Sequence, residues 1–79
     1  MKYKIITTAC KTCKNMLLYV DINEEGDYCA HLVAWHEDTD GEQLQEEIIS
    51  FGKSLEMAKS FISDYSIDSA TAFCNSNEF

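Results

Sequence analysis

Short apolar segments separated by glycine-containing turns make up most of this chain, and the pattern predicts a β-rich domain. Strands are expected at about 2–9, 16–23 and 27–37. A fourth segment, 43–51, is compatible with either a strand or a helix, because Leu44, Ile48 and Phe51 also stand at helical spacing. The β-branched pair of Ile48 and Ile49 just before a turn favours the strand.

Two similar turns predict the hairpins. The segments Asn23-Glu24-Glu25-Gly26 and Asp38-Thr39-Asp40-Gly41 both fit a three-residue loop built on a type I turn with glycine in the left-handed conformation. If Asn23 faces Asp27, the apolar cross-strand pairs are Ile22 with Tyr28, Val20 with Ala30, Leu18 with Leu32 and Met16 with Ala34. A shift of one residue would mix this face with Cys29 and His31, so the turn and the pattern indicate the same register.

The C-terminal third predicts one helix. Ser54 is a good N-cap residue, and apolar side chains then recur at helical spacing for about three turns. These side chains are Leu55, Ala58, Phe61, Ile62 and Tyr65. Residues 70–74 are expected to form a short closing strand. The prediction is a single α+β domain over residues 1–79, an antiparallel sheet of four to five strands with one amphipathic helix on one face (β-β-β-β-α-β).

One helix covers only one face of such a sheet. The opposite face is expected to carry Leu17, Tyr19, His31, Val33 and Trp35, with Ile49 or Phe51 beside them. An apolar surface of this kind indicates an interface with a partner protein or with a second copy of the chain, unless the sheet curls and buries it.

The charge of the chain restricts the class of partner. Fourteen acidic residues face six lysines, there is no arginine, and the formal net charge is −8. Direct binding of nucleic acid is therefore not expected, since it requires cations that replace the counterions of the phosphates. An acidic surface instead suits a protein whose own nucleic-acid-binding surface is basic.

The predicted partner-binding residues combine charge with aromatic anchors. The acidic members are Glu37, Asp38, Asp40, Glu42, Glu46 and Glu47, and the anchors are Tyr19 and Trp35. Carboxylates spaced along a hairpin can take the positions of phosphates, and tryptophan is favoured at binding hot spots. The alternative for the acidic run is a solvated hairpin tip.

The motif Cys10-Lys11-Thr12-Cys13 is a candidate half of a zinc site. In the predicted register it lies beside His36, so Cys10, Cys13 and His36, with Cys74 or water, would complete the ligands. The alternative is a pair of thiols at the end of a turn, and no other cofactor is expected. Nothing supplies an oxyanion hole or a third group for a Cys–His nucleophile, so enzymatic activity is not expected either.

Segments that insert in or cross membranes are not expected. No apolar run approaches the roughly 20 residues that span a bilayer, and the start of the chain lacks the apolar stretch of a signal peptide. The expected compartment is the cytoplasm, where the cysteines are reduced.

Two segments resemble the HicB-type antitoxin module. Residues 19–30 (YVDINEEGDYCA) resemble the first hairpin of that family, and residues 51–59 (FGKSLEMAK) resemble its strand-to-helix junction. The resemblance implies a partial RNase-H-like sheet with one helix that binds and blocks a small RNA-cleaving toxin. The added N-terminal strand, the acidic hairpin 36–46 and the lack of the family's C-terminal DNA-binding segment depart from it, and autorepression is not expected.

In size and charge the chain is also similar to small acidic inhibitors carried by phages, including anti-CRISPR proteins. The leading hypothesis is therefore a non-enzymatic inhibitor that occupies the nucleic-acid-binding surface of another protein. Two alternatives are a small zinc-stabilised domain and a homodimer joined through the apolar sheet face.

Overall fold

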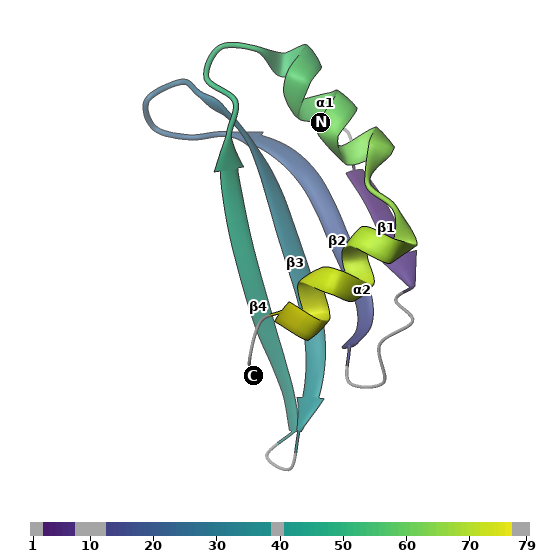
Figure 1. Ribbon diagram of the computed structural model, residues 1–79. Coiled ribbons are helices and arrows are strands. Elements are labelled where there is room, and N and C mark those ends of the chain that lie inside the picture. The colour runs from purple at the N-terminus through teal and green to yellow at the C-terminus, as the bar shows by residue number, and fades with distance from the viewer. Residues whose placement is uncertain (1–2, 8–12, 39–40, 77–79) are drawn as a thin grey trace.

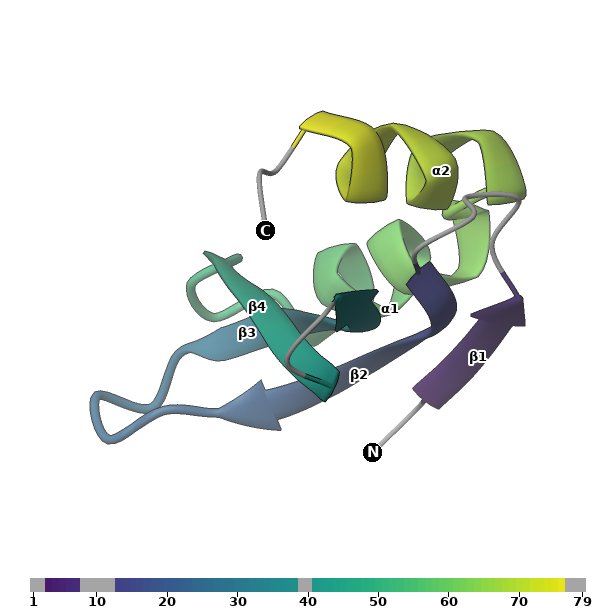
Figure 2. The same ribbon diagram turned by 90° about the horizontal axis from the view of Figure 1, so that it is seen from below.

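The molecule is a four-stranded sheet covered on one face by two helices. The computed structural model describes residues 3–7, 13–38 and 41–76, with side chains described for 3–7, 15–35 and 44–74. The strands are β1 (Tyr3–Thr7), β2 (Cys13–Ile22), β3 (Tyr28–Asp38) and β4 (Gly41–Ser50), and the helices are α1 (Leu55–Asp64) and α2 (Ile67–Ser76). The strands form one antiparallel meander in sequence order, and both helices lie on the same side of it (Figure 1, Figure 2). The predicted α+β class is confirmed.

The hairpin between β2 and β3 has the predicted register. The four apolar pairs, from Ile22 with Tyr28 to Met16 with Ala34, are all present. In the loop, the Asn23 N–H donates to the Asp27 carbonyl at 3.0 Å, and the Asn23 side-chain oxygen accepts from the N–H groups of Glu25 and Asp27 at 2.9 Å. Gly26 has a φ of 81°, so it takes the left-handed position that this loop requires.

The second hairpin differs from the prediction in its loop. Asp38 pairs with Gly41 and Glu37 with Glu42, so only residues 39–40, which lie outside the described residues, separate the strands. The predicted three-residue loop is therefore wrong by one residue. Two-residue loops are the commonest hairpin connections, and Gly41, with a φ of 114°, is the first residue of β4 and not the last residue of the loop. The segment that follows is a strand from Gly41 to Ser50, as the β-branched pair favoured.

Helix α1 begins and ends with identifiable contacts. The Ser54 hydroxyl accepts a hydrogen bond from the Met57 N–H at 3.3 Å, which confirms the predicted N-cap. At the other end, the Lys4 ammonium donates to the carbonyls of Ser63 at 3.1 Å and Tyr65 at 2.6 Å. A cation is favourable near the negative end of a helix, so this contact fastens edge strand β1 to α1.

The predicted closing strand at residues 70–74 is wrong, because these residues lie in the second helix, α2. The Ser66 hydroxyl accepts from the Ser69 N–H at 3.1 Å, and the Ser66 carbonyl accepts from the Ala70 N–H at 2.9 Å. Ala70, Phe73 and Cys74 stand at helical spacing and are all buried. The observed order is β-β-β-β-α-α, with two helices in place of the predicted one.

The core lies between the helices and one face of the sheet. Its buried members are Ile6, Met16, Leu18, Val20, Ala30, Leu32, Ala34, Ala58, Ile62, Ala70, Phe73 and Cys74. Helix α1 packs over β1, β2 and β3, and α2 packs against β1. Among the described residues, neither helix has the length and hydropathy that crossing a bilayer demands.

Candidate functional site

The face of the sheet that points away from both helices is the candidate site, and we name it the open face. Successive side chains of a strand point to opposite faces, so the buried positions of β2 and β3 identify their neighbours as open-face residues. Its apolar and aromatic members are Tyr3, Ile5, Leu17, Tyr19, His31, Val33, Trp35, Leu44 and Ile48. The five residues predicted from β2 and β3 are among them, which confirms that part of the prediction.

Cross-strand pairing arranges these side chains in rows. One row crosses all four strands from Tyr3 through Tyr19 and His31 to Ile48. A second row runs from Ile5 through Leu17 and Val33 to Glu46. Trp35 pairs with Leu44 in a further row on the same face. Directly opposed side chains lie within contact distance, so the rows form a continuous surface.

The edge strands supply the most exposed apolar groups of this surface. The exposed fractions are 68% for Tyr3, 62% for Ile5, 66% for Leu44 and 55% for Ile48. Single exposed apolar residues are ordinary on protein surfaces, whereas a contiguous exposed set is unusual and makes this face the candidate site. The sequence pattern missed all four, because pairing β1 and β4 with the central hairpin requires the sheet order.

The prediction that Ile49 or Phe51 joins the open face is wrong. Ile49 pairs with Ala30, a core residue, and both Ile49 and Phe51 pack against the core. The reason is the register of β4, in which Ile48 lies opposite His31. Since the pleat has a period of two, this single pairing decides which of the two adjacent isoleucines faces outward.

A polar cluster occupies the middle of the open face. The rings of Tyr19 and His31 are stacked, with centroids 4.5 Å apart and planes 6° from parallel. Nδ1 of His31 lies 3.2 Å from Oε2 of Glu46. Burial, followed by the negative charges of Glu46 and Asp21, raises the pKa of the Tyr19 hydroxyl. These contacts hold an aromatic pair and a carboxylate in fixed positions.

The charge of the described open face is negative. Asp21 and Glu46 are its carboxylates, and the charge of both acts on Tyr19. Two of the described lysines are engaged elsewhere: Lys4 contacts the end of α1, and Lys53 pairs with Asp27 at 3.0 Å. The open face therefore combines apolar area with carboxylates.

The predicted partner-binding residues are divided between the two faces. Tyr19, Trp35 and Glu46 lie together on the open face, whereas Glu47 pairs with the core residue Leu32 and belongs to the opposite face. The backbones of Glu37, Asp38 and Glu42 extend the β3–β4 ladder beyond the row of Trp35 and Leu44. Their side chains lie outside the described residues, and so does Asp40.

The predicted zinc ligands are only partly within the described chain. Cys13 and His36 are cross-strand partners, so the backbone register brings these two positions together as expected. Cys10 lies outside the described residues, as do the side chains of Cys13 and His36. Among the described side chains, no three histidines, cysteines or acids are grouped as a metal ion requires. The zinc site stays a prediction.

Comparison of the chain with family models, with characterised proteins and with solved structures finds no match. The resemblance to HicB-type antitoxins therefore rests on the two sequence segments alone.

Proposed function

We propose that this protein is a non-enzymatic binding module that covers a basic, nucleic-acid-binding surface of a partner protein with its open face. The observation that carries the proposal is the set of exposed apolar side chains on the open face, next to the carboxylates of Asp21 and Glu46. The helices cover the other face (Figure 2).

The apolar residues provide the area that a stable interface needs. Tyr19, His31 and Trp35 are half-buried on the central strands, while more exposed residues from β1 and β4 flank them. Tyrosine and tryptophan are enriched at binding hot spots because they present large contact areas with few rotatable bonds. A docked partner would remove this apolar area from water, and such burial contributes a favourable free energy of about 25 cal/mol for each Å².

The charge supports a basic partner surface. Glu46 is 44% exposed while its Oε2 contacts His31, so the carboxylate is held in place yet accessible. The sequence places further acidic residues on the same hairpin, Glu37, Asp38 and Glu42, whose backbones extend the β3–β4 ladder. Exposed carboxylates can pair with the lysines and arginines that otherwise contact phosphates, and charge complementarity speeds association. The HicB-like hairpin points to the same class of role.

A second copy of the chain is a poorer occupant of the open face. Each copy carries a net charge of −8, so face-to-face association of two copies would bring surfaces of like charge together. Like charges placed together across an interface cost several kcal/mol, and salt is needed to screen them.

The experiment is capture followed by competition. The protein is immobilised and exposed to a lysate rich in nucleic-acid-processing proteins, in parallel with the double variant Leu44→Ser, Ile48→Ser. We expect the wild type to retain a basic protein that elutes with salt, and the variant to lose it. The purified partner should then release bound DNA or RNA when this protein is added.

The outcomes separate the proposal from its alternatives. A retained protein that keeps its nucleic acid when this protein is added would contradict the proposal. A mass in solution near twice the 9.0 kDa of one chain, lost in the double variant, would mean that the open face joins two copies instead. Because Leu44 and Ile48 are both more than half exposed, the variant is expected to remain folded.

A further inference from the structure

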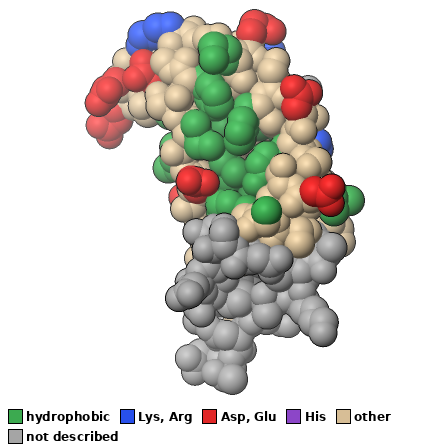
Figure 3. Space-filling model, viewed as in Figure 1, with side chains coloured by type: hydrophobic (Ala, Val, Ile, Leu, Met, Phe, Trp, Pro, Cys, Tyr) green, Lys and Arg blue, Asp and Glu red, His purple; other side chains and the backbone are tan. Residues whose placement is uncertain are grey.

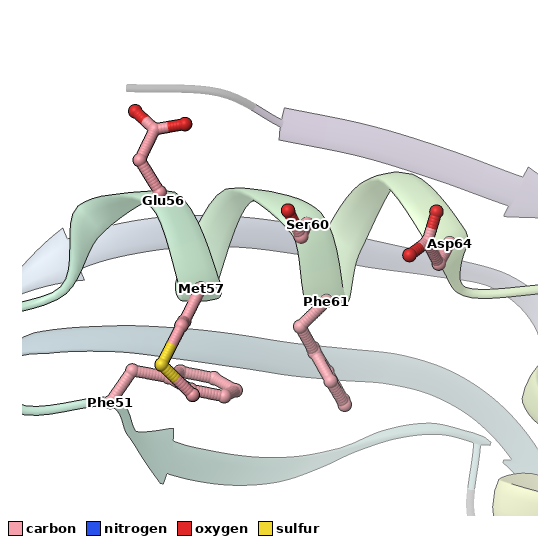
Figure 4. Close-up of a pocket in the computed structure, with 6 residues that line it drawn as sticks. All are labelled: Phe51, Glu56, Met57, Ser60, Phe61 and Asp64. Atoms are coloured by element: carbon pink, nitrogen blue, oxygen red, sulfur yellow. The ribbon is translucent and has the colours of Figure 1, made fainter.

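A second surface lies on the helix side of the molecule, along α1. It is a shallow groove of about 330 Å³, lined by Phe51, Glu56, Met57, Ser60, Phe61 and Asp64 (Figure 4). The groove shares none of these residues with the open face. A binding event there would therefore be independent of the proposed function.

Two rows of side chains border the groove. Glu56, Ser60 and Asp64 are spaced four residues apart and form a polar row along α1. Met57 and Phe61 have the same spacing and form the neighbouring apolar row, with Phe51 beside them. In Figure 4, Met57, Phe51 and Phe61 gather on one side of α1 while Glu56 points away from them.

The apolar side of the groove is formed by packed aromatic rings, but part of it is exposed to solvent. The ring centroids of Phe51 and Phe61 are 5.5 Å apart, and those of Phe61 and Tyr65 are 5.6 Å apart, so the aromatic rings support one another. Met57 is 59% exposed at the edge of this cluster. Its flexible thioether side chain adapts to different apolar partners, which is why methionine is common at binding grooves.

Carboxylates border the groove, and lysine side chains also lie on the same face of the molecule (Figure 3). Figure 3 shows a band of apolar side chains running between β4 and the helices, with carboxylates on both sides of it. None of the lining residues is basic. The partner therefore has to supply both apolar groups for the band and positive charges for its borders.

We propose that this groove docks an amphipathic helix of a partner protein whose apolar face is bordered by lysine or arginine. Parallel rows at i, i+4 spacing are the ridges between which the side chains of a second helix pack. The apolar residues of the docked helix would meet Met57, Phe51 and Phe61, in the helix-in-groove mode of recognition. Its cations would meet Glu56 and Asp64, and the small Ser60 between them leaves room for close approach.

The test uses a synthetic peptide of roughly four helical turns, with leucines at i, i+4 spacing and lysines on both sides of them. Its control has glutamate at every lysine position. Binding is followed by two-dimensional NMR of the labelled protein. We expect the lysine peptide to shift the signals of Met57, Ser60, Phe61 and Asp64, and the glutamate peptide to leave them unchanged.

Three variants sharpen the assignment. Met57→Gln keeps the size of an exposed side chain but removes the apolar anchor, and it should weaken peptide binding roughly tenfold. The isosteric double change Glu56→Gln, Asp64→Asn should weaken binding and flatten its dependence on salt. Ile48→Ser, on the open face, should leave peptide binding unaltered.

The proposal is overturned if the lysine peptide produces no shifts at a concentration of about 1 mM, the weakest affinity of interest. It is equally overturned if both peptides shift the same signals, or if the shifts map to the open face. Shifts at Met57 and Phe61 that grow with protein concentration alone would assign the groove to a second copy of the chain, contrary to the proposal.

Discussion

The two faces of the sheet are built from neighbouring residues of the same strands, yet they differ in what covers them. On β2, Leu18 is fully buried beneath the helices, while the adjacent Leu17 and Tyr19 are half-buried on the open face. The apolar content of the strands is therefore higher than one set of helices can bury. A sheet whose strands are apolar on both sides is expected to be packed against other structure on both faces. In the described part of the chain, only one face is packed in this way, by the two helices.

The polar groups of the two faces differ as well. On the covered face, Lys4 completes the C-terminal end of α1 and holds the cover in place. On the open face, Glu46 contacts His31 and remains 44% exposed, so its charge is available to a partner. Lys4 thus joins two elements of the fold, whereas Glu46 contacts its cross-strand neighbourhood and leaves part of its carboxylate exposed to solvent.

The largest effect that separates the two faces is expected from truncating one leucine on each. Leu18→Ala removes a fully buried side chain and should lower the free energy of unfolding by about 2–5 kcal/mol. Leu44→Ala removes a side chain that is 66% exposed, and the change should stay within about 0.5 kcal/mol. Urea denaturation of both variants measures the difference. Equal destabilisation would mean that the open face belongs to the folding core.

A smaller loss of stability is expected from substitutions in the turn between β2 and β3, which fixes the register of that hairpin. Gly26 has a φ of 81°, and a Cβ at this position would lie 3.2 Å from the Lys53 ammonium nitrogen, which can move aside. Gly26→Ala should therefore cost mainly the backbone strain, about 1–2 kcal/mol. Gly26→Asn is the matched control and should cost less, since asparagine tolerates this conformation. Denaturation midpoints that rank the two variants in the opposite order would contradict this account of the turn.

Removing the N-cap of α2 tests how much this helix contributes to stability. Ser66→Ala removes the hydroxyl that accepts from the Ser69 N–H and should lower the free energy of unfolding by about 1 kcal/mol. Ser54→Ala does the same for α1 and is the matched comparison. Thermal unfolding followed by circular dichroism measures both. An unchanged Ser66→Ala variant would indicate that α2 contributes little to covering the sheet.

The parts of the fold that the sequence predicted are those governed by local rules. The hairpin of β2 and β3 followed from the glycine turn and from alternation, and the start of α1 followed from Ser54. The strand at β4 followed from the paired isoleucines, although its loop is one residue shorter than expected. Each of these signals acts within a few residues, where the physical constraint is strongest.

The parts that were missed depend on tertiary structure. The strand predicted at residues 70–74 is wrong because Ala70, Phe73 and Cys74 are buried on one face of α2, and this burial depends on tertiary packing. Tyr3 and Ile5 join the open face only because β1 pairs with β2. The choice between Ile48 and Ile49 depends on the register of β4, which no local pattern specifies.

The smallest effect concerns two tyrosines, one on each face. Burial is the first cause that raises the pKa of both hydroxyls, and a carboxylate on the same side adds to it: Glu46 for Tyr19 and Glu47 for Tyr65. The native protein therefore keeps these protons above pH 10.0, the ordinary tyrosine value, where the unfolded chain releases them. The free energy of unfolding therefore keeps its full value below that pH and falls as the pH rises further, because the folded state resists ionisation of the two hydroxyls.

The adjacent carboxylates Glu46 and Glu47 allow the two faces to be tested separately. Glu46→Gln should lower the raised pKa of Tyr19 and leave that of Tyr65 unchanged, and Glu47→Gln should do the reverse. Both substitutions keep the size of the side chain and remove one charge, so each is the control for the other. Titration of the two tyrosine ring signals by NMR measures the shifts. If one substitution moved both tyrosines equally, the charge would be acting through the sheet, and the division of β4 into two independent faces would be wrong.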